Sequence, residues 1–322
     1  MPLSMDMSLE DLKKYKPALT RRGDFEDFWK NTLEEQKKFP LAVETVKIEY
    51  PVKGINVYDA SYNGCNGQRV QAWYLEPASK EQGGKVPAIV HFSGYTWARG
   101  YVSQYIMWAL QGYAVLAIDN RGQGGATPDN TVYSQGSFTG WFTRGILDKS
   151  EYYYKNVYVD CVRALDFLEA RHDVDMNRIG LLGGSQGGGL ALAVAGLDSR
   201  PAYVMCSFPF MCNLERAFEI ATDMPYMELV EYFKLFDPEM KSKVRVFETL
   251  SYFDVMNLAP SIKCPVLMAV ALMDRNCPPS TSFAAFNHIQ GEKECIVYPL
   301  HGHEALFSHI DHLFRFAAAH NA

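Results

Sequence analysis

One short stretch constrains the fold of this chain more than any other. Residues 178–190 read Arg-Ile-Gly-Leu-Leu-Gly-Gly-Ser-Gln-Gly-Gly-Gly-Leu, and a further apolar segment runs on to residue 195. This pattern is typical of a buried strand that turns sharply into a helix, with a serine, Ser185, at the tip of the turn. Gly183 and Gly187 permit a turn that is too tight for side chains on both flanks of the serine. The stretch predicts an α/β fold in which the Ser185 hydroxyl projects above the sheet.

The serine can be interpreted in two ways. In this turn it is suited to nucleophilic attack, because the helix that follows points its amide N–H groups and its positive dipole end at a developing oxyanion. The alternative is a glycine-rich phosphate loop, or a turn that carries a bystander serine. A phosphate loop of the Walker type needs Gly-Lys-Ser or Gly-Lys-Thr, and no lysine follows these glycines. We therefore favour Ser185 as a nucleophile.

The chain also supplies an acid in the order that such a serine requires. A serine hydroxyl is a weak nucleophile unless a base takes its proton, and an acid orients that base. In the α/β-hydrolase fold the acid and then the base follow the serine, each directly after a later strand. The apolar run 265–271 reads as such a strand, and Asp274 comes three residues after it. Asp274 is the candidate acid, and its alternative role is to cap a turn.

Two histidines compete for the role of base, because His301 and His303 both follow the predicted strand 295–298. We favour His303, since the glycine before it and a predicted last helix, 304–319, after it form a joint that can place its ring over the sheet edge. His301 lies nearer the strand, where a packing role is expected. A metal pair is disfavoured because no acidic or cysteine cluster completes a ligand set, so we expect neither a metal nor a cofactor.

The rest of the chain alternates strands and helices, which predicts a parallel sheet covered by helices on both faces. Strands are predicted at 43–50, 55–62, 69–74, 86–92, 113–118, 179–182 and 203–207, and helices at 24–37, 156–168 and 280–289. Residues 63–67 read as a hairpin connection, so residues 1–85 should add helices and antiparallel strands. We expect one α/β-hydrolase domain over residues 1–322, with a mostly parallel central sheet.

A long segment separates the strand that ends at residue 207 from the strand that begins at residue 265. A simple crossover needs far fewer residues. The surplus, residues 208–262, contains two predicted helical segments at 212–221 and 225–235. We expect a helical insertion before the acid-bearing strand, either as a lid over the active site or as an oligomer contact.

Two loops after predicted strands carry further candidate residues. Tyr95 lies where α/β-hydrolases supply their second oxyanion N–H, and with the N–H of Gln186 it would form an oxyanion hole. The alternative for Tyr95 is an ordinary glycine-containing turn. Arg121 and Gln123 follow the next strand. Arg121 has the charge to bind a substrate anion, but we favour a structural role in which it braces loops by hydrogen bonds to carbonyl groups.

Composition argues against several classes of function. The net charge of −6 disfavours nucleic-acid binding, and no run of 18 apolar residues is present, so no membrane span is expected. Residues 1–20 lack the apolar segment of a signal peptide. The seven cysteines include no Cys-x-x-Cys pair and read as reduced thiols. We therefore expect a cytoplasmic protein.

These motifs resemble those of carbohydrate esterase family 7, the acetyl xylan esterases and cephalosporin C deacetylases. The resemblance rests on Arg121-Gly122-Gln123, Gly183-Gly184-Ser185-Gln186-Gly187, Asp274 within 273–280 and His303-Glu304, and it extends through 152–158 and 283–289. It implies Ser185 as nucleophile, His303 as base, Asp274 as orienting acid and the amides of Tyr95 and Gln186 as oxyanion hole. Arg121, Gln123 and Glu304 are then structural or close to the substrate.

The resemblance also implies metal-independent removal of acetyl groups from small acetylated sugars and from cephalosporin C, in a hexamer built as a ring of dimers. One loop departs from the family pattern, because Ser93 stands where a histidine is expected and residues 97–101 replace a more polar run. Two other functions stay open. One is a serine peptidase of the prolyl oligopeptidase type, although too little chain precedes residue 86 for a propeller. The other is a non-catalytic, hydrolase-like binding module.

Overall fold

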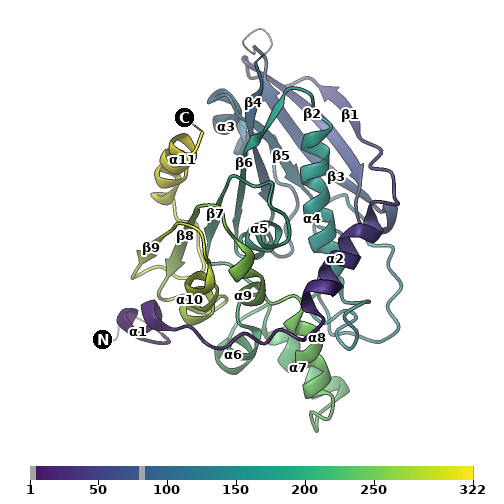
Figure 1. The fold of residues 1–322 in the computed structure, drawn as a ribbon, viewed down its shortest axis with the longest axis vertical. Helices are drawn as coiled ribbons and strands as arrows, with labels where there is room; N and C mark the ends of the chain where they lie inside the picture. The colour runs from purple at the N-terminus through teal and green to yellow at the C-terminus, as the bar shows by residue number, and fades with distance from the viewer. Residues whose placement is uncertain (1–4, 80–83, 322) are drawn as a thin grey trace.

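A nine-stranded sheet forms the centre of the described part of the chain, residues 5–79 and 84–321 of this computed structural model, in the order β1-β2-β3-β5-β4-β6-β7-β8-β9 (Figure 1). The strands are β1 Glu44–Ile48, β2 Ile55–Asn63, β3 Arg69–Pro77, β4 Val86–Phe92, β5 Ala114–Ile118, β6 Val174–Gly184, β7 Tyr203–Ser207, β8 Val266–Ala271 and β9 Lys293–Tyr298. Every pair from β5 to β9 is parallel, whereas β1, β2 and β3 join by antiparallel pairing. The predicted α/β-hydrolase fold is confirmed.

Helices cover both faces of this sheet because alternate residues of each buried strand point to opposite sides. In β4, Ile89 packs into one apolar core and Val90 into the other. The first core lies under two helices, α3 Ile106–Leu110 and α11 His309–Ala319. The second lies under α2 Phe25–Gln36, α4 Tyr153–Glu169, α5 Gln186–Leu197 and α10 Pro279–His288. Figure 1 shows α11 and α4 on opposite sides of the strands.

The antiparallel hairpin predicted in the N-terminal part is present. A 3-10 turn, η1 Cys65–Gly67, joins β2 to β3, and Asn66 and Gly67 adopt positive φ angles of 55° and 74°. A further short helix, α1 Leu9–Lys14, packs against α10. The predicted hairpin and the helix at 24–37 are thus confirmed, with α2 one residue shorter at each end.

The insertion after β7 contains four helices within the described residues, α6 Leu214–Ile220, α7 Met227–Phe236, α8 Lys243–Ser251 and α9 Val255–Leu258. Figure 1 shows α6, α7 and α8 gathered at one end of the molecule, beyond the strand ends. The first two match the predicted helical pieces, and the other two were not predicted. Asp254 explains one of them, because its carboxylate accepts the N–H of Met256 at 2.9 Å and so caps α9.

The prediction of a last helix over 304–319 is wrong at its start. Helix α11 begins at His309, and residues 299–308 are non-helical, with turns at 299–300 and 307–308. The Glu304 carboxylate accepts the N–H of Gly302 at 3.1 Å, and the Glu304 N–H donates to the Gly302 carbonyl at 3.0 Å. These two bonds close a tight turn that holds the chain out of the helix, so His303 is carried by a loop.

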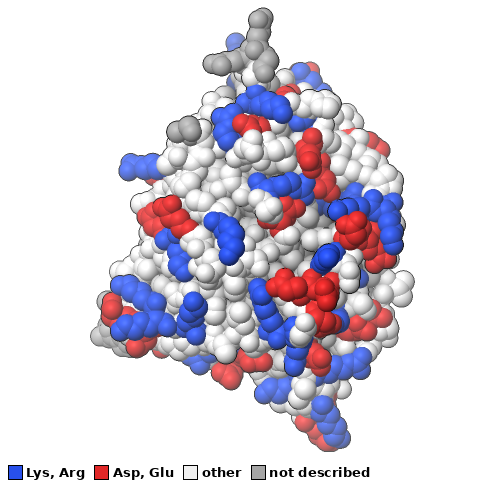
Figure 2. Space-filling view, viewed as in Figure 1, with Lys and Arg blue, Asp and Glu red and all other residues white. Residues whose placement is uncertain are grey.

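In the part of the chain that the structure describes, no helix has the length and apolar character that a bilayer crossing requires. The face of the molecule drawn in Figure 2 carries acidic and basic side chains that are interspersed.

Candidate active site

Ser185 occupies a strained turn between β6 and α5. Its φ of 56° and ψ of −122° are rare for a residue with a side chain and typical of functional turns. The Ser185 N–H donates to the Ser207 carbonyl at 3.0 Å, and the Ser185 carbonyl accepts the N–H of Phe210 at 2.9 Å. The turn is thus fixed against the segment that follows β7.

Glycine is required on both flanks of this serine for a steric reason. A Cβ on Gly183 would lie 2.3 Å from backbone atoms of Gly187, and a Cβ on Gly187 would lie 2.0 Å from the Phe92 carbonyl oxygen. Both distances are far below van der Waals contact with backbone that cannot easily move. The tight approach of strand, turn and helix explains the Gly-x-Ser-x-Gly spacing.

Ser185, His303 and Asp274 lie in one hydrogen-bonded chain. The Nε2 atom of His303 lies 2.9 Å from Ser185 Oγ, and its Nδ1 atom lies 2.8 Å from Asp274 Oδ2. The other oxygen of Asp274 accepts the N–H groups of Asn276 and Cys277, at 2.9 and 2.8 Å. The Asp274 carboxylate is buried and held in one orientation, and the imidazole bridges it to the serine hydroxyl.

The competing histidine lies elsewhere. The His301 ring packs edge-on against Tyr298, with ring centres 5.5 Å apart, and the His301 carbonyl accepts the Met273 N–H at 3.0 Å. Glu304 is exposed, and its carboxylate is engaged in the local turn. The structure therefore places His303 at the serine, and His301 and Glu304 at the strand end and the turn.

A residue that sequence reasoning missed packs on the imidazole. The Phe208 ring lies 4.7 Å from that of His303, between centres, and Phe208 has a positive φ of 34°. An unusual backbone conformation at a bulky residue is found mainly where the surroundings enforce it. The only signal in the sequence is the position of Phe208, directly after a strand whose neighbours carry the site.

Tyr95 and Gln186 each present a backbone N–H near the serine turn. Gln186 is the first residue of α5, and Tyr95 lies in the turn after β4, a strand that pairs with β6 up to Gly183. Among the described residues neither N–H has a hydrogen-bond acceptor. Two free N–H groups at the carboxyl ends of adjacent strands are suited to bind an oxyanion.

Gln123 ties these two positions together. Its Nε2 donates to Gln186 Oε1 at 2.9 Å, and the Gln186 amide donates back to Gln123 Oε1 at 3.1 Å. Gln123 Oε1 also accepts the N–H of Thr96, the residue after Tyr95, at 2.9 Å. Gln123 therefore links the loop of Tyr95 to the side chain of Gln186, which is a structural role that supports both candidate oxyanion donors.

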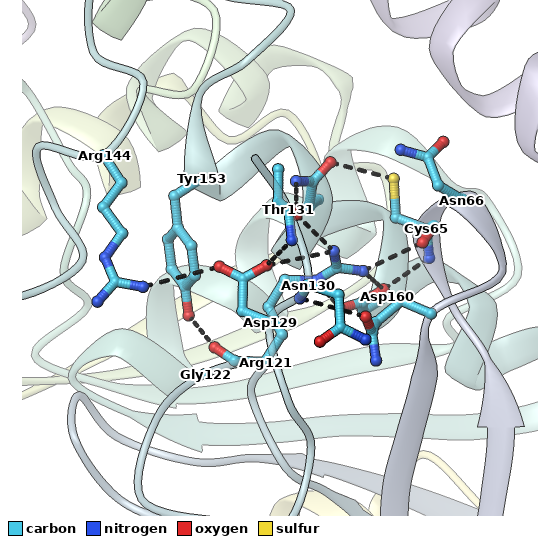
Figure 3. Close-up of polar contacts among 12 residues, drawn as sticks. Cys65, Asn66, Arg121, Gly122, Asp129, Asn130, Thr131, Arg144, Tyr153 and Asp160 are labelled. Carbon is cyan, nitrogen blue, oxygen red and sulfur yellow. Dashed lines mark hydrogen bonds and ion pairs between the residues drawn. The ribbon is translucent and has the colours of Figure 1, made fainter. Parts of the chain in front are cut away.

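Arg121 forms a buried network with Asp160 on α4 (Figure 3). Its Nε and Nη2 atoms donate to the two oxygens of Asp160 at 2.7 and 2.6 Å, and Nη2 also donates to the Cys65 carbonyl at 3.3 Å. The Tyr153 hydroxyl donates to the Arg121 carbonyl at 2.6 Å. Arg121 thus has the predicted structural role of bracing loops. The predicted partners were carbonyl groups, whereas its main partner is the Asp160 carboxylate.

Comparisons with known proteins identify the family of the chain. The family model of acetyl xylan esterase (AXE1) matches residues 1–320. The acetyl esterase Axe7A of Xylanibacter ruminicola is 30% identical over 300 residues, which are 89% of this chain, and the chain spans only 65% of the length of that relative.

Two solved structures are similar over nearly their whole length. An acetyl xylan esterase from Paenibacillus sp. R4 is 48% identical with a TM-score of 0.96, and the match covers 97% of this chain and 99% of that one. Acetyl xylan esterase 1 from Thermoanaerobacterium sp. is 34% identical with a TM-score of 0.94, over 99% and 100% of the two chains.

Proposed function

Because the chain belongs to the acetyl xylan esterase family of carboxylic ester hydrolases, we propose that it removes acetyl groups from small acetylated sugars by serine chemistry. The names of the similar proteins support the acetyl ester as substrate. The serine mechanism rests on one observation, the hydrogen-bonded chain from Ser185 through His303 to Asp274. Cephalosporin-type acetyl esters belong to the same proposal, since they present the same acyl group on another alcohol.

The reaction begins when Ser185 Oγ attacks the ester carbonyl carbon and His303 Nε2 accepts the hydroxyl proton. The Asp274 carboxylate accepts a hydrogen bond from the Nδ1–H of the imidazole, which keeps Nε2 free to act as the base and stabilises the imidazolium that forms. The N–H groups of Tyr95 and Gln186 stabilise the oxyanion of the tetrahedral intermediate.

The second half of the reaction repeats these roles with water. The imidazolium of His303 returns its proton to the leaving alcohol, and Ser185 keeps the acetyl group as an ester. Water then attacks that ester while His303 Nε2 accepts a proton from it. When the second intermediate collapses, His303 returns this proton to Ser185 Oγ, and acetate leaves. No step needs a metal or a cofactor.

Hydrolysis of p-nitrophenyl acetate by variants tests the proposal. Ser185→Ala and His303→Ala should each lower kcat by at least about 10³-fold, because the members of a triad act as a unit. His301→Ala is the matched control and should keep most of the activity. Full activity in Ser185→Ala contradicts the serine mechanism, and loss of activity in His301→Ala alone reverses the choice of base.

Two further measurements separate the alternative functions. An acyl-peptide substrate should be cleaved far more slowly than the ester, and the opposite preference supports a serine peptidase. Inactivity on both substrates supports a binding module. Rates on acetyl, propionyl and butyryl esters of xylose and on a cephalosporin test the acyl preference, which should favour acetyl. The hexamer and the cytoplasmic location stay predictions.

A further inference from the structure

The side chain of Tyr95 contacts helix α7 of the insertion. Its hydroxyl donates a hydrogen bond to Glu228 Oε1 on α7 at 2.5 Å and accepts the N–H of Trp141 at 2.7 Å. The Tyr95 ring packs edge-on against that of Trp141, with centres 5.4 Å apart. The loop that carries one candidate oxyanion donor is therefore anchored to a helix more than a hundred residues later in the chain.

Glu228 is buried, with 1% of its surface exposed, and its carboxylate lies against a glycine and a backbone N–H. Its second oxygen, Oε2, accepts the N–H of Phe142 at 3.0 Å. A Cβ on Gly140 would lie 2.2 Å from Oε1, and the φ of Gly140 is +133°, a conformation that favours glycine. A carboxylate thus occupies a pocket that is shaped for it beside the Tyr95 hydroxyl.

Both oxygens of Glu228 face hydrogen-bond donors, namely the Tyr95 hydroxyl and the Phe142 N–H. Only the ionised carboxylate accepts at both, because a protonated acid or an amide turns one acceptor into a donor. Burial raises the pKa of Glu228 to about 7, against the opposing effect of the Tyr95 hydrogen bond. Glu228 also interacts with other titratable groups among the described residues, which include Tyr95, Tyr152, Tyr154 and the cation Arg144.

We infer that Glu228 is a positioning residue for the reaction: through the Tyr95 hydroxyl, its carboxylate fixes the loop whose N–H stabilises the oxyanion. Helix α7 of the insertion is then connected to the catalytic apparatus rather than only a cover for it. The inference rests on the proposed serine mechanism and on the role given to the Tyr95 N–H. It assigns to part of the 208–262 segment a function that neither the lid nor the oligomer contact describes.

A double-mutant cycle tests this role. Glu228→Gln keeps the side-chain shape but offers one acceptor, and Tyr95→Phe removes the hydroxyl while it keeps the backbone N–H. Each should lower kcat for p-nitrophenyl acetate by about 10- to 100-fold with little change in KM, somewhat less than the loss of an oxyanion donor itself. If Glu228 acts through the Tyr95 hydroxyl, the double variant should lose no more than either single one.

The control is Glu231→Gln on the same helix, because Glu231 pairs with Lys234 at the surface, and this variant should keep the wild-type kcat. The acid side of the kcat/KM profile distinguishes positioning from mere structure. The wild-type acid limb should include one proton uptake, at Glu228, that is absent from the limbs of Glu228→Gln and Tyr95→Phe. Multiplying losses in the double variant, or a wild-type acid limb in Glu228→Gln, overturn the inference.

The outcome is separable from that of the proposed function. An inactive Ser185→Ala together with a Glu228→Gln variant of wild-type kcat refutes only the inference about Glu228. An active Ser185→Ala refutes the serine mechanism and the inference with it. If Glu228→Gln does not fold, Tyr95→Phe alone carries the test, and a wild-type kcat and acid limb in that variant overturn the inference.

Discussion

Replacement of Asp160 by asparagine should destabilise the fold far more than it alters the chemistry. The side chains of Arg121 and Asp160 are only 2% and 3% exposed, and two hydrogen bonds join them. Breaking such a buried pair leaves the guanidinium with a more distant ionic partner, the Asp129 carboxylate 3.9 Å from Nη1, and costs up to about 3–5 kcal/mol. With an unfolding entropy of roughly 0.7 kcal/mol/K for a chain of this length, the midpoint should fall by up to about 4–7 °C.

Thermal unfolding followed by circular dichroism measures this change. The matched control is Asp175→Asn, because Asp175 pairs with Arg178 at the surface with side chains 24% and 34% exposed, and the loss there should be less than about 1 kcal/mol. Below both midpoints, Asp160→Asn should retain most of the wild-type kcat on p-nitrophenyl acetate. An unchanged midpoint with lost activity would refute the structural assignment and indicate that Arg121 serves the substrate.

Three further predictions concern the turn, the oxyanion loops and pH. Gly187→Ala should lower kcat by about 10²-fold, because the new Cβ would lie 2.0 Å from the Phe92 carbonyl oxygen and displace the serine turn. The control is Gly23→Ala, which should keep the wild-type kcat in the same assay because no atom of a described residue beyond its two chain neighbours lies within 4 Å of the new Cβ. Gln123→Leu should lower the free energy of unfolding in urea by about 1–3 kcal/mol, because it leaves the Thr96 N–H and the Gln186 amide without their partner. It should also reduce kcat, and an unaffected kcat contradicts the role of Gln123 in supporting the two oxyanion donors. Burial raises the pKa of Glu228 from 4.5 to about 7, so between these two pH values the native state holds a proton there that the unfolded state has released, and above them both states are ionised. Wild type should therefore lose up to about 3 kcal/mol of stability relative to Glu228→Gln as pH rises through that window, and a gain in urea titrations would contradict the sign.

The sequence predicts the centre of the fold because the parallel strands are short apolar runs with recognisable turns after them. The site follows from the same signal. Ser185, Asp274 and His303 come after β6, β8 and β9, and the carboxyl ends of parallel strands share one edge of a sheet. The motif around Ser185, the placement of the candidates after strands and their order in the chain were thus together enough to predict that these three side chains meet.

What the sequence did not predict depends on contacts between distant residues. Asp160 and Glu228 are single carboxylates inside helices, and their partners lie 39 and 133 residues away. No local pattern distinguishes such a carboxylate from one on a solvated helix face, because only packing decides what surrounds it. The early start predicted for α11 has a local cause instead, since the Glu304 turn competes with helix formation in a segment of helix-compatible composition.

Strand β9 lies at the edge of the sheet, where β8 is its only strand partner among the described residues, and none of its six residues is fully buried. The loop that carries His303 leaves from this strand, so the imidazole is attached to the least enclosed strand of the parallel half of the molecule. Margins of sheets open at lower free-energy cost than their centres. Transient unpairing of β9 from β8 would displace His303 and stop catalysis, while Ser185, its turn and most of the secondary structure stay intact. Activity would then be lost at a lower temperature than most of the secondary structure. Any contact that stabilises strand β9 would lengthen the half-life of activity on heating.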